Sequence, residues 1–198
     1  NQLSWVVTSY LLASTASTPL YGKLGDMYGR KPVFLAAIVI FLSGSLLSGL
    51  SESMLELIAF RAVQGVGAGG LMVGAQAIVA DLVPPRERGR YMGLIGSVFA
   101  VASVAGPLLG GFFVESLSWH WVFLINLPIG VVAIVVVVLR LQLHTPTHRH
   151  SIDWLGATLL TAGVSALILV TTWGGDRYAW GSSQILALAA TGLMLLAV

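Results

Sequence analysis

The sequence contains no cysteine and few charged residues. Without cysteine, the 198-residue chain cannot form a disulfide, a thiolate zinc site or a cysteine nucleophile, which excludes disulfide-stabilised secreted folds and thiol enzymes. Charged residues make up only 9% of the chain, against roughly a quarter in an ordinary soluble domain. No nucleotide-binding loop, catalytic triad or zinc signature occurs, so we expect neither an ATP-driven pump nor an enzyme. The net charge of +2 is too small to indicate nucleic-acid binding.

Apolar residues are abundant and fall into long runs. Hydrophobic residues make up 57% of the chain, and its mean hydropathy is +0.90. Apolar segments, of which only the third contains a charge, occupy residues 1–22, 33–51, 57–80, 91–114, 122–139, 154–175 and 178–198. Each has about the 20 residues that a membrane helix needs, and none has the regular polar face of a helix in a soluble bundle. The sequence therefore predicts an all-α integral membrane protein with about seven transmembrane helices.

The basic residues lie almost entirely on one side of this predicted topology. Because successive segments alternate in direction, the stretches that connect them fall into two sets. One set carries Lys23, Arg30, Lys31, Arg86, Arg88, Arg90, Arg140 and Arg149. The other set carries Arg177 alone. The positive-inside rule places the first set in the cytoplasm, so the first segment runs from outside to inside.

The stretch between the first two segments, residues 22–32, combines glycines, an acid and bases at fixed spacing. Gly25 and Gly29 allow close backbone approach, and Asp26 can pair with Arg30 one helical turn later. We expect a sharp cytoplasmic turn. The stretch resembles the loop signature G-x-L-a-D-r-x-G-R-k of the major facilitator superfamily, with Met27 where the family often has arginine. The alternative is a solvated basic loop that merely follows the positive-inside rule. The resemblance implies a cytoplasmic gating role for Gly22, Gly25, Asp26, Gly29, Arg30 and Lys31.

The third segment contains Arg61 at a depth where a charge is unfavourable. It lies several residues inside the outer end, about 10 Å deep at roughly 1.5 Å per residue. A charge there costs about 2.5 kcal/mol or more, so Arg61 is a functional candidate unless it snorkels to the outer interface. Gln64 lies on the same helical face and could bind water or a polar group of a substrate. Residues 57–69 resemble the fourth-helix motif l-x-x-x-R-x-x-q-G-x-g-a-a of proton-coupled members of the superfamily, which implies that Arg61 couples protons.

The fourth segment has small residues at every fourth position, namely Ala102, Gly106 and Gly110. This spacing predicts a groove in which a neighbouring helix packs closely. A plain packing face would explain the spacing, but it would not require the adjacent Gly-Pro and Gly-Gly pairs that Pro107 and Gly111 complete. The segment resembles the fifth-helix antiporter motif g-x-x-x-G-P-x-x-G-G. In the superfamily this motif marks exporters, which favours efflux.

Residues 119–128 resemble the W-R-W-x-F-x-x-N-x-P stretch of the fourteen-helix drug:proton antiporters of the EmrB/QacA type, with His120 in place of the usual arginine. The sixth and seventh segments are similar to the two extra helices that join the halves of those transporters. The resemblance implies a fragment that covers helices two to eight. It also implies that the proton carrier, an aspartate of the first helix, lies outside the chain. The expected parts are a transporter half at 1–141, a cytoplasmic linker at 142–152, and the extra helix pair, its second helix truncated, at 153–198.

Asp81 ends the third segment on the predicted cytoplasmic side, where the family places an acid beside the loop signature. We predict that Asp26, Arg30 and Asp81 form a charge cluster that latches the outward-open state, with Arg90 as a further candidate. The alternative is a set of loose surface ion pairs, each worth at most about 1 kcal/mol.

Two further groups of polar residues can be explained either by structure alone or by a function. A polar stripe on the first segment contains Ser14, Ser17, Thr18 and Tyr21. It faces protein or a water-filled cavity, and helix packing explains it at least as well as substrate contact. The predicted linker contains His144, His148 and His150. We expect a solvated loop there and no metal site.

Taken together, these resemblances imply a secondary transporter that exports drugs or other amphipathic or cationic small molecules in exchange for protons. Protons would be the coupling ion, and no cofactor is expected. We expect a multi-pass protein of the cytoplasmic membrane, bacterial in origin, that is surrounded by lipid and monomeric when complete. The alternatives are an importer or narrow-substrate metabolite exporter of the same superfamily, and a non-transporting membrane sensor or assembly protein on the same scaffold.

Overall fold

The computed structural model describes residues 2–143 and 153–197, and the regular elements in these two ranges are all α-helices. Only Ile125 separates α5 from α6, so these two form one interrupted rod. The linker histidines named above, His144, His148 and His150, lie outside the described residues. The helices are α1 (Gln2–Tyr28), α2 (Arg30–Gly49), α3 (Met54–Leu82), α4 (Arg88–Ser116), α5 (Trp121–Leu124), α6 (Asn126–Arg140), α7 (Trp154–Trp173) and α8 (Ser183–Ala197).

Each predicted apolar segment corresponds to one helix, with α5 and α6 together forming the fifth. In the described part of the chain, the helices long and apolar enough to cross a membrane are α2, α3, α4, the α5–α6 rod and α7. Helix α8 is apolar but shorter. Helix α1 is 27 residues long and more polar, because it contains several serines and threonines and carries Lys23 and Asp26 near its end. The prediction of an all-α, multi-pass membrane protein is confirmed.

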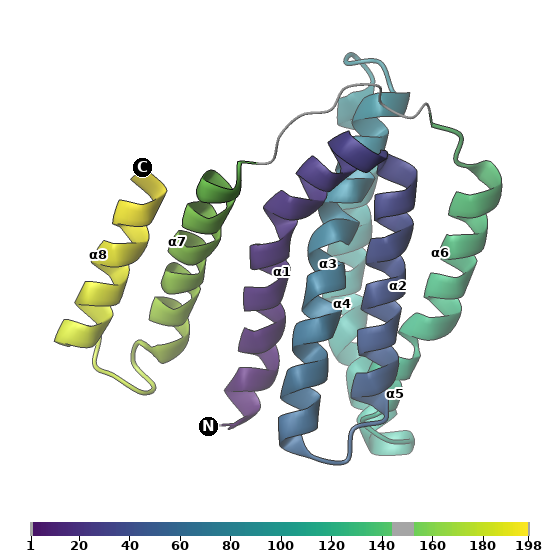
Figure 1. Ribbon diagram of the computed structural model, residues 1–198. Coiled ribbons are helices and arrows are strands. Elements are labelled where there is room, and N and C mark those ends of the chain that lie inside the picture. The colour runs from purple at the N-terminus through teal and green to yellow at the C-terminus, as the bar shows by residue number, and fades with distance from the viewer. Residues whose placement is uncertain (1, 144–152, 198) are drawn as a thin grey trace.

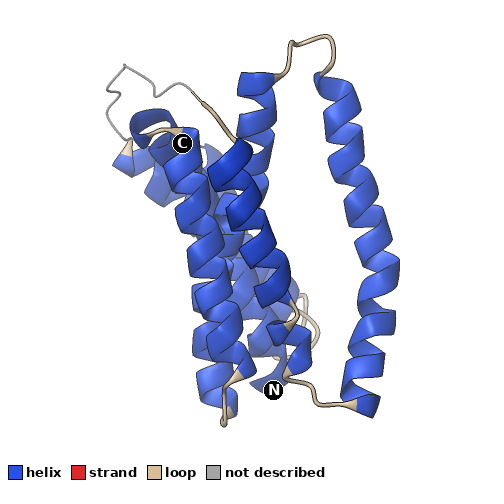
Figure 2. Ribbon diagram, turned by 90° about the vertical axis from the view of Figure 1, so that its right-hand side faces the viewer, coloured by secondary structure: helices blue, strands red, loops and turns tan. Residues whose placement is uncertain are grey.

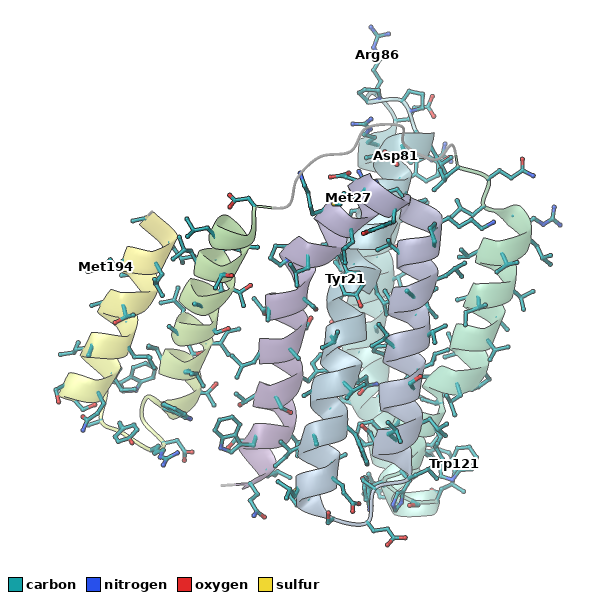
Figure 3. All side chains as sticks on the ribbon, viewed as in Figure 1. Tyr21, Met27, Asp81, Arg86, Trp121 and Met194 are labelled. Atoms are coloured by element: carbon teal, nitrogen blue, oxygen red, sulfur yellow. The ribbon has the colours of Figure 1, made fainter. Side chains whose placement is uncertain are left out.

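The two ends of the bundle differ in chemistry. Met27, Asp81 and Arg86 gather at one end, and Trp121 lies at the other (Figure 3). We call the first the basic end, because the α1–α2 and α3–α4 connections with Arg30 and Arg86 lie there, and the second the tryptophan end. The α2–α3 and α7–α8 connections both lie at the tryptophan end (Figure 1). The basic connections are thus segregated as the charge count along the sequence predicts.

Helix α3 packs between α1 and α2 and makes the most extensive contacts in the molecule with them (Figure 1). Its glycines make this possible. A Cβ at Gly65 would overlap the backbone of Tyr10 in α1, and a Cβ at Gly67 would overlap the backbone of Phe41 in α2. In a membrane, where lipid is as apolar as the side chains, such close approach of small residues drives helix association. The three helices therefore form the packed centre of the described fold.

Helix α4 stands apart from this centre (Figure 2). None of its residues is buried, and a Cβ at Gly106, Gly110 or Gly111 would meet no atom of the described chain within 4 Å. The groove predicted around Ala102 and Gly106 is thus not filled by any described helix. On the other side of the centre, α7 packs against α1 and α8 packs against α7.

The connection between α1 and α2 is shorter than the sequence predicts. We expected residues 22–32 to form a turn, but α1 continues to Tyr28 and α2 begins at Arg30, which leaves Gly29 as the only residue outside a helix. Residues 23–28 contain no proline and only one glycine, so nothing interrupts the helix earlier. Gly29 reverses the chain with φ of 95°, a backbone conformation that glycine adopts without strain.

Candidate functional site

Arg61 projects from α3 toward α1 and α5 at the tryptophan end. Its Nε donates a hydrogen bond to the carbonyl of Val6 at 3.3 Å, and its guanidinium carbon lies 4.0 Å from the centre of the Tyr10 ring. The ring of Phe123 in α5 lies 5.7 Å away. Within the described residues, no carboxylate lies within ion-pair distance of Arg61. The charge is therefore held by the carbonyl of Val6, the side-chain amide of Gln64 and two aromatic faces. These groups favour a cation without neutralising it.

Gln64 lies one helical turn after Arg61 and is almost completely buried, with 2% of its surface exposed. Its Oε1 accepts a hydrogen bond from Arg61 Nη1 at 2.6 Å, and its Nε2 donates one to Ser45 Oγ in α2 at 3.0 Å. Both ends of the amide thus reach protein groups. Because so little of the side chain is exposed, the predicted contact with water or substrate would require the surrounding helices to move.

Ser45 extends the hydrogen-bonded network from α3 to the α5–α6 rod. It is fully buried, and its hydroxyl donates to the carbonyl of Phe123 at 2.8 Å. Asn126, the first residue of α6, donates from Nδ2 to Ser45 Oγ at 3.0 Å and to the Phe123 carbonyl at 3.2 Å. We call Arg61, Gln64, Ser45, Asn126 and Phe123 the outer network.

Sequence reasoning identified Arg61 and Gln64 but did not single out Ser45 or Asn126. Ser45 was one of several serines in an apolar segment, and no rule of spacing distinguishes a buried serine from a surface one. Asn126 did carry a signal, because it is the one amide in an apolar run from Val122 to Leu139 and precedes Pro128 by two residues. A polar side chain at such a position calls for a partner.

A second cluster lies at the basic end and is centred on Arg30, the first residue of α2. Its Nη2 lies 2.7 Å from Asp26 Oδ1 at the end of α1, and its Nε lies 3.2 Å from Asp81 Oδ2 at the end of α3. A third donor, Nη1, reaches the carbonyl of Gly22 at 3.4 Å. The Arg30 side chain is 23% exposed, so this ion-pair cluster is shielded less than the outer network but more than a free surface pair. One guanidinium thus links the basic ends of three helices.

Lys31, to which the loop signature gives a gating role, and Arg90, a further candidate for the cluster, do not join it. The Lys31 ammonium donates to the carbonyls of Val138 and Leu141 at 2.9 and 2.8 Å, where it caps the end of α6. Successive residues of a helix differ by about 100° in direction, so Lys31 faces α6 when Arg30 faces α1 and α3. In the described part of the chain, the Arg90 side chain has no hydrogen bond or ion pair.

Arg88, rather than Arg90, contacts the end of α3. Its Nη2 donates to the carbonyl of Ala80 at 2.6 Å, and its Nε donates to the carbonyl of Val83 at 3.1 Å. These carbonyls belong to the last turn of α3, which has no helical donors of its own. The sequence places Arg86, Arg88 and Arg90 two residues apart, and such spacing does not show which of them turns back to α3.

The polar stripe of α1 is engaged mainly with protein. The Ser17 hydroxyl is buried and contacts two carbonyls, that of Ser14 in its own helix at 3.1 Å and that of Val66 in α3 at 3.0 Å. Thr18 donates to the carbonyl of Ser14 at 2.8 Å. This part of the stripe therefore fits the role of helix packing.

His120 lies at the tryptophan end, directly before α5. Its ring stacks on Trp119 with 3.8 Å between ring centres, and its Nδ1 lies 2.6 Å from the Ser118 hydroxyl. The described residues contain no cluster of His, Asp and Glu that could hold a metal ion. The imidazole is thus fixed by its immediate neighbours in the sequence.

Comparisons with known proteins identify the family of the chain. The family model described as Major Facilitator Superfamily matches residues 1–198. Multidrug resistance protein 3 of Bacillus subtilis is 44% identical over 188 residues, which is 95% of this chain and 37% of that protein. The MFS-type efflux pump LUC4 of Fusarium sp is 42% identical over 196 residues, 96% of this chain and 35% of that protein. The chain thus spans about a third of the length of these curated relatives.

A solved structure shows the same fold. The crystal structure of the human organic anion transporter MFSD10 (TETRAN) matches with a TM-score of 0.64 and 24% sequence identity. The match covers 95% of this chain and 43% of that one. At this identity the likeness concerns the arrangement of helices alone.

Proposed function

Because the chain belongs to the Major Facilitator Superfamily, we propose that it acts within a longer secondary transporter that exports small molecules in exchange for protons. Relatives named as a multidrug resistance protein and an efflux pump support the direction of transport. The antiporter-like residues Gly106, Pro107 and Gly110 on α4 support it as well. The substrates are amphipathic or cationic compounds, and protons are the coupling ion.

The observation that carries this proposal is the state of Arg61. A membrane-spanning helix holds its cation half-buried, with neutral partners and without a carboxylate among the described residues. A charge kept at such a position responds strongly to any change in nearby charge, because the surroundings screen it little. Arrival of a proton at an acidic group, or of a cationic substrate, would therefore change how Arg61 binds Gln64 and Tyr10.

The ion-pair cluster at the basic end supports a gating role. Arg30 bridges Asp26 and Asp81, so it holds the ends of α1, α2 and α3 together at what we take to be the cytoplasmic side. Closure at this side is the condition of an outward-open transporter. In the proposed cycle the cluster forms in the outward-open state and opens when the transporter faces inward, by rocking of one bundle against another.

Helix α4 is proposed to act as pivot and seal. Its small residues at Ala102, Gly106 and Gly110 face no described helix. We propose that a helix from the rest of a longer, monomeric transporter packs there, and that the protein lies in the cytoplasmic membrane of a bacterium. The segregation of the basic residues at one end supports the orientation.

Uptake by everted membrane vesicles tests the proposal. Vesicles that contain the full-length protein should accumulate a fluorescent cationic dye when respiration acidifies their interior, and a protonophore should stop uptake. Arg61→Ala should abolish this uptake. Arg177→Ala is the matched control, because Arg177 also contacts aromatic rings, those of Trp173 and Tyr178, but at the tryptophan end of α7 and away from the outer network. Dye uptake that is indifferent to the proton gradient, or no uptake at all, overturns proton-coupled efflux.

A further inference from the structure

The outer network forms one continuous chain of hydrogen bonds from a cation to a backbone carbonyl. Arg61 donates to Gln64, Gln64 donates to Ser45, and Ser45 donates to the carbonyl of Phe123. The three bonds measure 2.6, 3.0 and 2.8 Å, and they cross from α3 through α2 to α5. Every donor points away from the guanidinium. Bonds aligned in this way polarise one another, so each strengthens the next.

Ser45 has no hydrogen-bonding capacity left over. A hydroxyl has one donor and two acceptor positions. Ser45 donates to Phe123 and accepts from Gln64 and from Asn126. Because the residue is fully buried, water cannot replace a partner that leaves. Loss of any one bond therefore leaves an unsatisfied group in an apolar setting, which is unfavourable.

The far end of the chain lies at the break between α5 and α6. Pro128 has no N–H, so it cannot donate to the carbonyl of Leu124 as a helical residue at that position would. The break at Ile125 is slight, since this residue keeps helical φ and ψ of −60° and −25°, and the side chains of Ser45 and Asn126 bind the carbonyl of Phe123 beside it. Side chains from α2 and α6 thus hold the backbone where the helix is interrupted.

Phe123 meets Arg61 by two routes. Its carbonyl receives the hydrogen-bonded chain, and its ring lies 5.7 Å from the guanidinium carbon. A shift of Arg61 away from Gln64 would weaken both contacts together. The position of α5 relative to α3 therefore depends on where the cation points.

We propose that Gln64, Ser45 and Asn126 are positioning residues that transmit the contacts of Arg61 to the α5–α6 break. When Arg61 binds Gln64, the chain is complete and α5 is held against α2 and α3. When a proton or substrate draws Arg61 away, Ser45 loses its polarised donor, and α5 with its tryptophan end is released. This role deepens the proposed transport function, since it makes the outer network the link between the coupling residue and the tryptophan end of the bundle.

Hydrogen exchange of the amides at 121–127 in the full-length protein measures this link without requiring transport. We expect Ser45→Ala to speed their exchange about fivefold, the factor that loss of one hydrogen bond implies. Gln64→Glu keeps an acceptor for Arg61 but removes the donor to Ser45, so it should speed exchange similarly. Ser43→Ala is the matched control, because Ser43 lies in the same helix, is exposed and donates to the carbonyl of Val39 one turn earlier in that helix. Ser43→Ala should leave the exchange rates of the amides at 121–127 unchanged.

A double-mutant cycle separates transmission from simple packing. Arg61→Ala alone should speed exchange at 121–127 about fivefold. In the Ser45→Ala background it should add less than a factor of about two, because the hydrogen bonds that join Gln64 to Phe123 through Ser45 are already absent. Additive effects, or unchanged exchange in Ser45→Ala, overturn the inference. If Ser45→Ala does not fold, Asn126→Ala tests the same link from α6 by the same criterion.

Transport assays on these variants distinguish this inference from the proposed function. Non-additive exchange in a protein that moves no dye refutes proton-coupled efflux and leaves the transmission intact. The opposite outcome is dye transport that requires Arg61 but does not change in Ser45→Ala and Gln64→Glu. If the rate, the half-saturating dye concentration and the pH profile of these variants equal those of the wild type, the transmission is refuted and efflux is left intact. We expect the rate and its pH profile to change while the half-saturating concentration stays within about twofold, since Ser45 and Gln64 are buried and bind protein groups.

Discussion

Helices α3 and α4 are both 29 residues long and rich in glycine, yet their surroundings differ completely. Gly65 and Gly69 of α3 lie against the backbone of α1 and Gly67 lies against that of α2, and seven residues of this helix are buried. No residue of α4 is buried. Glycine spacing predicts that a helix can be approached closely, but it does not say by what.

The polar residues of the two helices follow the same division. Helix α3 carries Arg61 and Gln64 in the outer network and Asp81 in the ion-pair cluster, so it links both ends of the bundle. Helix α4 contributes one polar link to α3, through Arg88 at its first residue. We infer from this contrast that α3 holds the described helices together, and that the small-residue face of α4 packs against a helix outside the described residues.

The largest effect is expected from filling a glycine of α3. Gly67→Val should lower the free energy of unfolding by about 3 kcal/mol, because the new side chain would overlap the backbone of Phe41, which cannot move aside. Thermal unfolding of the full-length protein in detergent, followed by tryptophan fluorescence, measures this. Gly93→Val on α4 is the control, since a Cβ there meets no described atom within 4 Å. Equal destabilisation by the two variants would remove the contrast between the helices.

The next effect concerns transport and should come from α4. Gly106→Leu should lower the rate of dye transport about tenfold or more while the unfolding temperature changes little, because the small-residue face is proposed to meet a helix outside the described residues during the cycle. Vesicle uptake and thermal unfolding are measured on the same preparation. Leu108→Ala is the control, because Leu108 is 70% exposed and carries no small-residue spacing. Wild-type transport in Gly106→Leu would contradict a pivot on this face.

Much of the fold follows from the sequence because hydrophobicity and charge act locally along a membrane chain. Long apolar runs predicted a helix in each of the seven segments, and the segregated basic residues predicted the two ends of the bundle. The i, i+4 spacing of Asp26 and Arg30 predicted their ion pair, which measures 2.7 Å. These features depend on neighbours in the sequence, which is why sequence alone reveals them.

The contacts that the sequence did not reveal depend on which way a side chain points from its helix and on partners that are distant in the sequence. Lys31 and Arg30 are adjacent, yet one caps α6 and the other bridges α1 and α3. Ser45 binds Asn126 across 81 positions, and nothing in an apolar segment marks which serine will do so. The roles proposed for these residues remain predictions, while their contacts are now defined.

A smaller effect is expected at the basic end of α3. Asp81→Asn should shift the population toward the inward-open state about threefold, because the ion pair with Arg30 is partly exposed and is worth no more than about 1 kcal/mol. Distances between spin labels on either side of the basic end would report the shift. Glu87→Gln serves as control, since it removes an acid from the same end that forms no ion pair in the described residues. Unchanged populations and transport in Asp81→Asn would show that the cluster does not latch the transporter.

The smallest effect should separate two arginines at the start of α4. Arg88→Gln should lower the free energy of unfolding by about 1 kcal/mol, because the carbonyls of Ala80 and Val83 at the end of α3 lose their donor. Arg90→Gln should change it by less than about 0.5 kcal/mol, as is usual for a surface substitution that removes no contact. Both variants remove one positive charge from the same turn of α4, so a general electrostatic effect would be equal in the two. A difference between them would therefore show that a specific contact at the first residue of α4 fastens it to α3, and identical unfolding would show that the Arg88 contact does not stabilise the fold.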